Sequence, residues 1–229
     1  MQSERLIIGS KYKSLLESSL SEFEIIWLPD NPFVDKRLSG HADLSVFNLN
    51  NSALFTIDYY KDIDFGTNTI FINEKIGSLY PDDVKLNICL VGDVIIVNRE
   101  FMSETVLNYM FAASDYKYIN VKQGYTKCST LVLNSDTIIT SDPGIHREAI
   151  KNNIHSLKIS PGYIDLEGFD YGFIGGSGFV IDNILYLTGT IDKLPEKNEI
   201  FKLCADNNID IKYLTNLNIF DIGGAVSVG

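Results

Sequence analysis

The sequence predicts an α/β fold made of five copies of one unit (a strand, a helix, a second strand and a hairpin) that close into a ring. Three observations predict it. Strand-like and helix-like stretches alternate along all 229 residues. Three segments can be superimposed on one another. Units of about 45 residues account for the whole chain, with no linker left for a second domain. We therefore expect one domain over residues 1–229.

The superimposable segments begin at Gly40, Gly124 and Gly172. They read GHADLSVFNLNNSALFTI, GYTKCSTLVLNSDTIITS and GFIGGSGFVIDNILYLTG. Each starts with Gly followed by His or an aromatic residue, and then has a Ser before an alternating apolar strand. An Asn- or Asp-rich stretch follows, at 50–52, 134–136 and 182–183, and leads to a second apolar strand. This composition predicts hairpin turns.

The second strand of each hairpin leads into a helical stretch and then into a further strand. Ser141 or Asp142 is expected to cap one helix with Pro143 in its first turn, and Pro195 opens another. The units start near residues 6, 54, 93, 138 and 184, and the second copy is the least regular. Repeats that bury a face only against their neighbours form rings or solenoids, and we favour a ring because the last unit ends at the C-terminus.

Composition and charge exclude several classes of partner. The net charge is −11, and no Lys/Arg cluster provides the basic surface that nucleic acid or an anionic membrane needs. The N-terminus does not resemble a signal peptide, and no apolar run approaches the ~20 residues of a membrane span. The three cysteines are far apart and odd in number, which favours reduced thiols in the cytoplasm. We expect no metal and no organic cofactor; the oligomeric state is not predicted.

Two motifs resemble a known family. The segment HADLSVF, which starts at His41, is similar to the H-x-D-x-x-F segment of arginine deiminases. The pair Gly223-Gly224 is similar to the C-terminal G-G-x-x-x-Cys of the same family. With the five units, the chain resembles the pentein fold, the five-bladed α/β propeller of the guanidino-group-modifying superfamily, and within it an uncharacterised bacterial branch. The resemblance covers the whole chain at the level of repeat architecture.

The resemblance implies a deiminase-like hydrolase, or a transferase, that acts on a guanidine or ureido group of a small cationic ligand in the central channel. In such enzymes a cysteine thiolate attacks the guanidinium carbon, a histidine moves protons, and carboxylates hold the cation. His41 matches the acid/base residue and Asp43 the orienting carboxylate. Residues two apart on a strand point the same way, so both are expected to face the channel. The alternative for His41 is a polar residue at the start of a strand, satisfied by the backbone.

The cysteine departs from the family pattern. The last unit reads GGAVSVG and has Ser227 and Val228 where the thiol is expected. The substitute candidate is Cys128, which follows Gly124 by four residues in another unit. The alternative is a small buried residue, and on a regular strand Cys128 would face away from the Asp43 side unless a bulge intervened. The remaining cysteines, Cys89 and Cys204, are predicted to be core residues.

Four acids are candidate ligand-binding residues: Asp142, Glu167, Asp170 and Asp221. The alternatives are a helix cap for Asp142 and exposed loop acids for Glu167 and Asp170. Asp83 falls at the position of His41 if Asn87 is aligned with Ser45.

A second functional hypothesis is a non-catalytic ligand- or partner-binding protein on the same scaffold, like the ribosome anti-association factor of archaea and eukaryotes. The missing terminal cysteine motivates it. A third is a sensor that binds a cationic amine without turnover.

Overall fold

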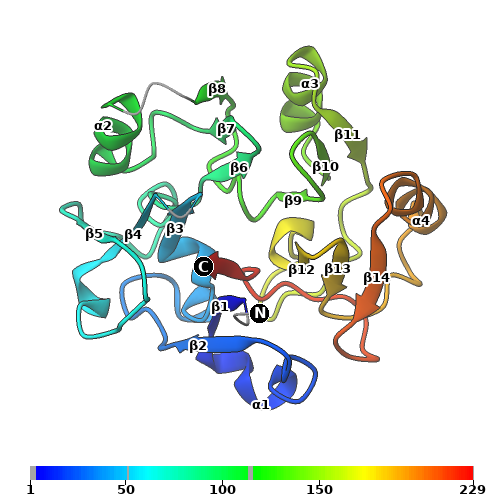
Figure 1. Ribbon diagram of the computed structural model, residues 1–229, viewed down its shortest axis with the longest axis horizontal. Coiled ribbons are helices and arrows are strands. Elements are labelled where there is room, and N and C mark those ends of the chain that lie inside the picture. The colour runs from blue at the N-terminus through cyan, green and yellow to red at the C-terminus, as the bar shows by residue number, and fades with distance from the viewer. Residues whose placement is uncertain (1–3, 51, 113–115, 229) are drawn as a thin grey trace.

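The computed structural model describes residues 4–50, 52–112 and 116–228. Within them the strands form five sheets of three strands each. In every sheet the middle strand pairs antiparallel with one neighbour and parallel with the other. Figure 1 shows the sheets set around the middle of the molecule, with the C-terminal strand close to the N-terminal one. The protein is therefore an α/β structure with several small sheets.

The strands, sheet by sheet, are β15 (Val226–Val228), β1 (Arg5–Gly9) and β2 (Glu24–Leu28); β3 (Val46–Leu49), β4 (Ala53–Ile57) and β5 (Thr69–Ile72); β6 (Cys89–Val91), β7 (Val94–Val97) and β8 (Lys117–Asn120); β9 (Thr130–Val132), β10 (Thr137–Thr140) and β11 (His155–Lys158); β12 (Gly178–Ile181), β13 (Ile184–Leu187) and β14 (Asp210–Tyr213). The α-helices are α1 (Lys13–Leu16), α2 (Glu104–Ala112), α3 (Pro143–Lys151) and α4 (Lys197–Asp206). Short 3₁₀ helices are η1 (Ser10–Tyr12), η2 (Lys36–Leu38), η3 (Ala42–Leu44), η4 (Asp58–Tyr60) and η5 (Ile174–Gly176).

The predicted order of elements is confirmed in four of the five units. The five predicted unit starts coincide with the middle strands β1, β4, β7, β10 and β13. A helix and a parallel strand follow four of them, as the sequence indicated. The second unit is the least regular because η4 replaces an α-helix between β4 and β5. The helix expected to open at Pro195 begins two residues later, at the start of α4, with Glu196 as its N-cap.

The predicted hairpin turns are also found where the structure describes them. Asp182 and Asn183, between β12 and β13, have φ angles of 48° and 59°. Positive φ at both central residues is the geometry of a tight hairpin turn, and Asn and Asp tolerate it well. Asn50 has a φ of 44° at the corresponding turn, whereas Asn51 lies outside the described residues.

The middle strands form the inside of the core. β4, β7 and β10 are buried along their whole length, because each has a strand on both sides and packed side chains on both faces. No helix of the described ranges is long and apolar enough to cross a membrane.

A short segment precedes the first strand of each hairpin and the C-terminal strand β15. We call these five stretches the ring segments: residues 41–45, 83–87, 125–129, 173–177 and 221–225. They carry most of the residues singled out by the sequence.

Candidate active site

The ring segments are joined to one another by hydrogen bonds. Each is bonded to the next in chain order, and the last is bonded to the first. The bonds that link neighbours are Asn87 Nδ2 to Asp43 O (3.2 Å), Lys127 N to Asn87 Oδ1 (2.9 Å), Lys127 Nζ to Gly175 O (3.1 Å), Gly224 N to Gly176 O (2.9 Å) and Asp43 N to Gly223 O (3.3 Å). The segments therefore form a closed ring, although they are far apart in the sequence.

A cavity of about 450 Å³ and a smaller one of about 290 Å³ lie beside this ring. The smaller cavity is the candidate active site. Its size is at the low end of the range of small-molecule sites, and its wall is largely apolar with a few polar groups, as such sites are. It is lined by Leu38, His41, Leu44, Tyr125, Cys128, Leu166, Phe169, Asp170, Tyr171, Phe173 and Asp221.

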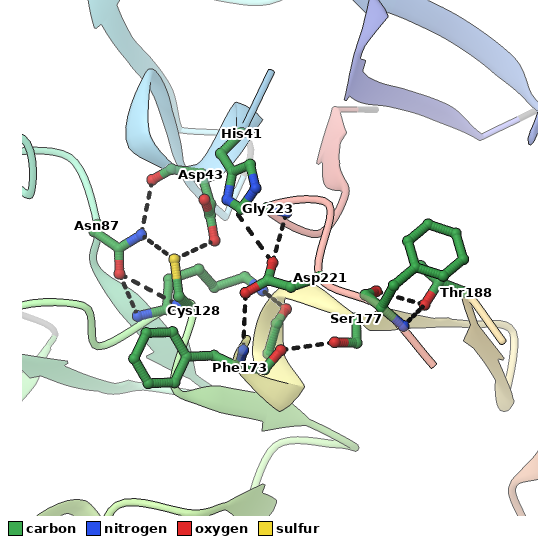
Figure 2. A network of polar contacts seen from close by, with 12 residues as sticks. His41, Asp43, Asn87, Cys128, Phe173, Ser177, Thr188, Asp221 and Gly223 are labelled. Carbon is green, nitrogen blue, oxygen red and sulfur yellow. Dashed lines mark hydrogen bonds and ion pairs between the residues drawn. The ribbon is translucent and has the colours of Figure 1, made fainter. Parts of the chain in front are cut away.

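The thiol of Cys128 is held by two polar side chains. Its Sγ donates to Asp43 Oδ2 at 2.9 Å, and Asn87 Nδ2 donates to Sγ at 3.0 Å (Figure 2). The Oδ1 of the same Asn87 accepts the backbone N–H groups of Lys127 and Cys128. Asn87 thus fixes both the backbone and the sulfur of Cys128. Sequence reasoning noticed its position in the repeat but assigned it no role.

The expected strand geometry around these residues is wrong. Residues Ala42–Leu44 form η3, and the residues before β9 form a turn. In a 3₁₀ helix or a turn, side chains do not alternate between two faces as they do in a strand. Leu44 and Cys128 consequently line the same cavity as His41, and Cys128 bonds to Asp43 without the bulge that a regular strand would have required.

His41 lies next to the buried carboxylate of Asp221 (Figure 2). It is only 2% exposed, and its Nδ1 is 3.8 Å from Asp221 Oδ1. The Asp221 carboxylate accepts N–H groups from two ring segments, through Gly223 N at 2.9 Å and Phe173 N at 2.8 Å. These bonds fix Asp221, so its carboxylate can orient the imidazole of His41.

Two buried polar atoms at the site have no hydrogen-bond partner among the described residues: His41 Nε2 and Asp43 Oδ1. An unsatisfied buried polar group costs about 1–3 kcal/mol, so native structures rarely keep one without a reason. Both belong to residues that surround the Cys128 thiol and the cavity. Their free lone pairs or protons are suited to a polar ligand.

Burial at this site disfavours negative charge on Asp43 and Cys128. Burial raises the pKa of Asp43 to about 6, although the nearby His41 and Lys127 oppose the rise. Burial also raises the pKa of the Cys128 thiol well above its ordinary value, and the neighbouring carboxylates of Asp43 and Asp221 raise it further. Without a ligand, Cys128 is therefore a neutral thiol at neutral pH.

Gly223, the first residue of the Gly223-Gly224 pair, packs closely against His41. Both residues have positive φ angles, of 74° and 64°. A Cβ added at Gly223 would lie 2.5 Å from both Cα and Cβ of His41. Only glycine allows this close approach and this backbone conformation together.

The other predicted acids are distributed differently. Asp170 lies in the cavity wall and is exposed. Glu167 does not line the cavity; its carboxylate is 3.3 Å from Lys11 Nζ on the surface. Asp142 also lies outside it, because its Oδ1 caps α3 by accepting the N–H groups of Gly144 and Ile145.

The remaining residues singled out by the sequence are buried. Asp83 accepts a hydrogen bond from the Tyr125 hydroxyl. Cys89 and Cys204 are free thiols in the core and do not line the cavity. Sequence reasoning missed the part of the wall formed by Leu166, Phe169 and Tyr171, which no local pattern marks.

Replacing Gly223 with Ala should displace His41. Gly162 is a matched control, because it has a φ of 95° and nothing within 4 Å of an added Cβ. Gly162→Ala should cost only the backbone strain of about 1–2 kcal/mol. Gly223→Ala adds the overlap with His41, so urea unfolding should show a larger loss, and the NMR signals of the His41 ring should shift in this variant alone. Equal losses and an unmoved His41 would contradict the assigned packing.

Asp43→Asn should change how stability depends on pH. The folded-state pKa of about 6 exceeds the ordinary 3.8, so the native protein binds this proton more tightly than the unfolded chain does. The Asp43 contribution to stability is therefore greatest below the ordinary pKa and declines as pH rises to about 6. Between pH 3.8 and about 6, the free energy of unfolding of Asp43→Asn, measured by urea unfolding, should rise relative to that of wild type by on the order of 3 kcal/mol. The exposed Asp62→Asn serves as control, and a difference independent of pH would refute the buried carboxylate.

Known structures share this fold. Dimethylarginine dimethylaminohydrolase from Pseudomonas aeruginosa, solved as a cysteine-to-serine mutant with citrulline, is 10% identical with a TM-score of 0.57, over 100% of this chain and 99% of that one. Agmatine deiminase from C. jejuni is 11% identical with a TM-score of 0.56, over 93% and 87%. The amidinotransferase SxtG from Microseira wollei is 8% identical with a TM-score of 0.55, over 100% and 95%. The chain thus has the pentein fold of these guanidino-group-modifying enzymes.

Sequence comparison gives a family without an activity. No curated protein matches the chain significantly. One family model, described as a family of unknown function (DUF6873), matches residues 7–226. Because the match spans nearly the whole sequence, the chain belongs to the DUF6873 family.

Proposed function

We propose that this protein is a hydrolase or transferase that acts on a guanidine or ureido group of a small cationic ligand. One observation carries the proposal: the Cys128 thiol, the His41 imidazole and the Asp221 carboxylate, from three ring segments, line one cavity, and a further carboxylate, that of Asp43, accepts a hydrogen bond from the thiol. The fold is shared with enzymes whose names specify guanidine compounds or their products. Glu167 and Asp142 have no part in this proposal because they lie outside the cavity.

The chemistry follows from the positions of the groups. Cys128 is the nucleophile, and its proton passes to Asp43, to which the thiol already donates. The thiolate forms a bond to the guanidinium carbon, and the leaving amine departs with a proton from His41. His41 then takes a proton from water, whose oxygen attacks the same carbon. The carbon–sulfur bond breaks, the thiol regains its proton, and a ureido product and an ammonium ion have formed.

A cationic ligand would also counter the negative charge around the Cys128 thiol. Asp43 and Asp221 both disfavour the thiolate of Cys128. A guanidinium bound between them would offset this negative charge and lower the pKa of the thiol. Asp221, and Asp170 at the mouth of the cavity, are the proposed binding carboxylates for the rest of the positive charge. The nucleophile would then be activated only when substrate is present.

The arrangement of the five sheets is part of the proposal. We infer that the five sheets are the blades of a five-bladed α/β propeller formed by a single domain over residues 1–229. The closed ring of hydrogen bonds among the ring segments supports this inference, because a ring of this kind requires the sheets to surround a common centre.

Cys128→Ser should abolish turnover. The test is incubation with a panel of guanidine compounds, with products and protein adducts followed by mass spectrometry. Wild type should form product, or a covalent adduct on Cys128, and the variant should form neither. Cys204→Ala is the control, because that thiol is buried away from the cavity. Full turnover by Cys128→Ser would reject the nucleophile.

Guanidinium ion should lower the pKa of Cys128 by about 1–3 pH units, because an opposite charge nearby has an effect of this size. The thiolate is followed by ultraviolet absorbance against pH at non-denaturing guanidinium concentrations, with the Cys128→Ser signal subtracted. Urea, which is planar and uncharged, is the matched control ligand and should leave the titration unchanged. An equal effect of both compounds would argue against charge neutralisation by the ligand.

A second candidate function is cationic-ligand binding without turnover. It is favoured by one observation: burial, together with the two carboxylates of Asp43 and Asp221 beside the thiol, raises the pKa of Cys128 well above its ordinary value. Under this function, a guanidine compound raises the melting temperature of wild type and of Cys128→Ser equally, and neither protein forms product.

A further inference from the structure

The larger cavity, of about 450 Å³, is distinct from the candidate active site. The two share no lining residue. Its wall comes from the strands that follow the ring segments, namely β3, β6, β9, β12 and β15, with residues that adjoin them. Ring-segment residues such as His41 and Phe173 therefore line the smaller cavity, and residues a few positions later in the chain, such as Phe47 and Phe179, line the larger one.

The wall of the larger cavity is mostly apolar. Phe47, Leu86, Leu131 and Phe179 are buried side chains that line it. The polar lining residues include Asn50, Asn134 and Ser227, which are exposed. A cavity with this volume, an apolar interior and polar groups at its rim has the character of a small-molecule site.

Lys127 is the one charged residue in the described wall of this cavity. It is half-buried, next to Cys128 in the chain, and its ammonium donates to the carbonyl of the buried Gly175 at 3.1 Å. Lys127 forms no ion pair with a carboxylate in the described part of the chain. An ammonium has three donors, so two remain for a ligand.

We propose that the larger cavity binds a small monocarboxylate with an apolar tail. The carboxylate accepts hydrogen bonds from Lys127, and the tail lies against Phe47, Leu131 and Phe179. A half-buried cation without a carboxylate partner, in a wall that is otherwise uncharged and has apolar side chains in its interior, is complementary to this chemistry. Although the protein has a net charge of −11, its other exposed charges are screened over about 8 Å at physiological ionic strength, so they oppose the anion weakly.

The competing explanation is that Lys127 serves only as a counter-charge for Asp43, whose pKa it lowers. The two explanations differ in what fills the cavity. A counter-charge alone gives no selectivity for a carboxylate among ligands with the same tail.

The test is isothermal titration calorimetry with octanoate and, as the uncharged analogue, octanamide. Octanoate should bind at least about tenfold more tightly, because charge-assisted hydrogen bonds contribute that much. Lys127→Met should reduce octanoate affinity to that of octanamide, and Val180→Trp, which fills the cavity, should abolish binding of both. Lys122→Met, an exposed lysine outside this cavity, and Phe169→Ala, in the smaller cavity, should leave octanoate affinity unchanged.

Several results would overturn the proposal. They are equal affinities for octanoate and octanamide, undiminished binding by a folded Lys127→Met variant, loss of binding in Phe169→Ala, or no binding at millimolar ligand. Binding of inorganic phosphate in preference to octanoate would also refute the apolar tail. If Lys127→Met does not fold, the comparison of the two ligands and the Val180→Trp variant still decide the outcome.

Discussion

The closed ring of hydrogen bonds among the ring segments is the constraint on which the site depends. Asn87, Lys127 and Asp43 all take part in the hydrogen bonds of this ring. Asn87 and Asp43 also hydrogen-bond to the Cys128 thiol. The charge of Lys127 acts on Asp43 and opposes the rise of its pKa. The groups that close the ring therefore also set the positions of the reactive groups. A shift of one segment would break a bond on either side of it, which keeps the geometry of the cavity coupled to the packing of all five sheets.

The ring buries ionisable groups without fully compensating them. The protein places Asp43 and Cys128 in contact and leaves Asp43 Oδ1 without a partner in the described structure. Burial of two acidic groups side by side favours their neutral forms, and a cation restores the charged ones. The buried carboxylates of Asp43 and Asp221 beside the thiol are the physical reason for proposing a cationic ligand, independently of any resemblance.

Local patterns predicted the fold well because its signals are local. Turn residues such as Asp182 and Asn183 and the alternating apolar strands fixed the order of elements. The sequence also identified His41, Asp43, Cys128 and Asp221 as candidates. It could not predict that the thiol bonds to a carboxylate, because this contact depends on a 3₁₀ turn rather than a strand. It identified Asp170 in the loop at 166–171 but not the apolar wall residues Leu166, Phe169 and Tyr171 of the same loop, whose positions depend on tertiary packing.

The site is formed by different side chains at the same position of the five ring segments. The first positions of the ring segments hold His41, Asp83, Tyr125, Phe173 and Asp221. His41 and Asp221 lie together, whereas Tyr125 bonds to Asp83 and its ring centroid is 6.0 Å from that of Phe173. One side of the cavity is therefore ionic and the other aromatic. Under the proposed function, the charged group of the ligand lies on the first side and its apolar part on the second, so the asymmetry of the ring would set the orientation in which Cys128 meets it.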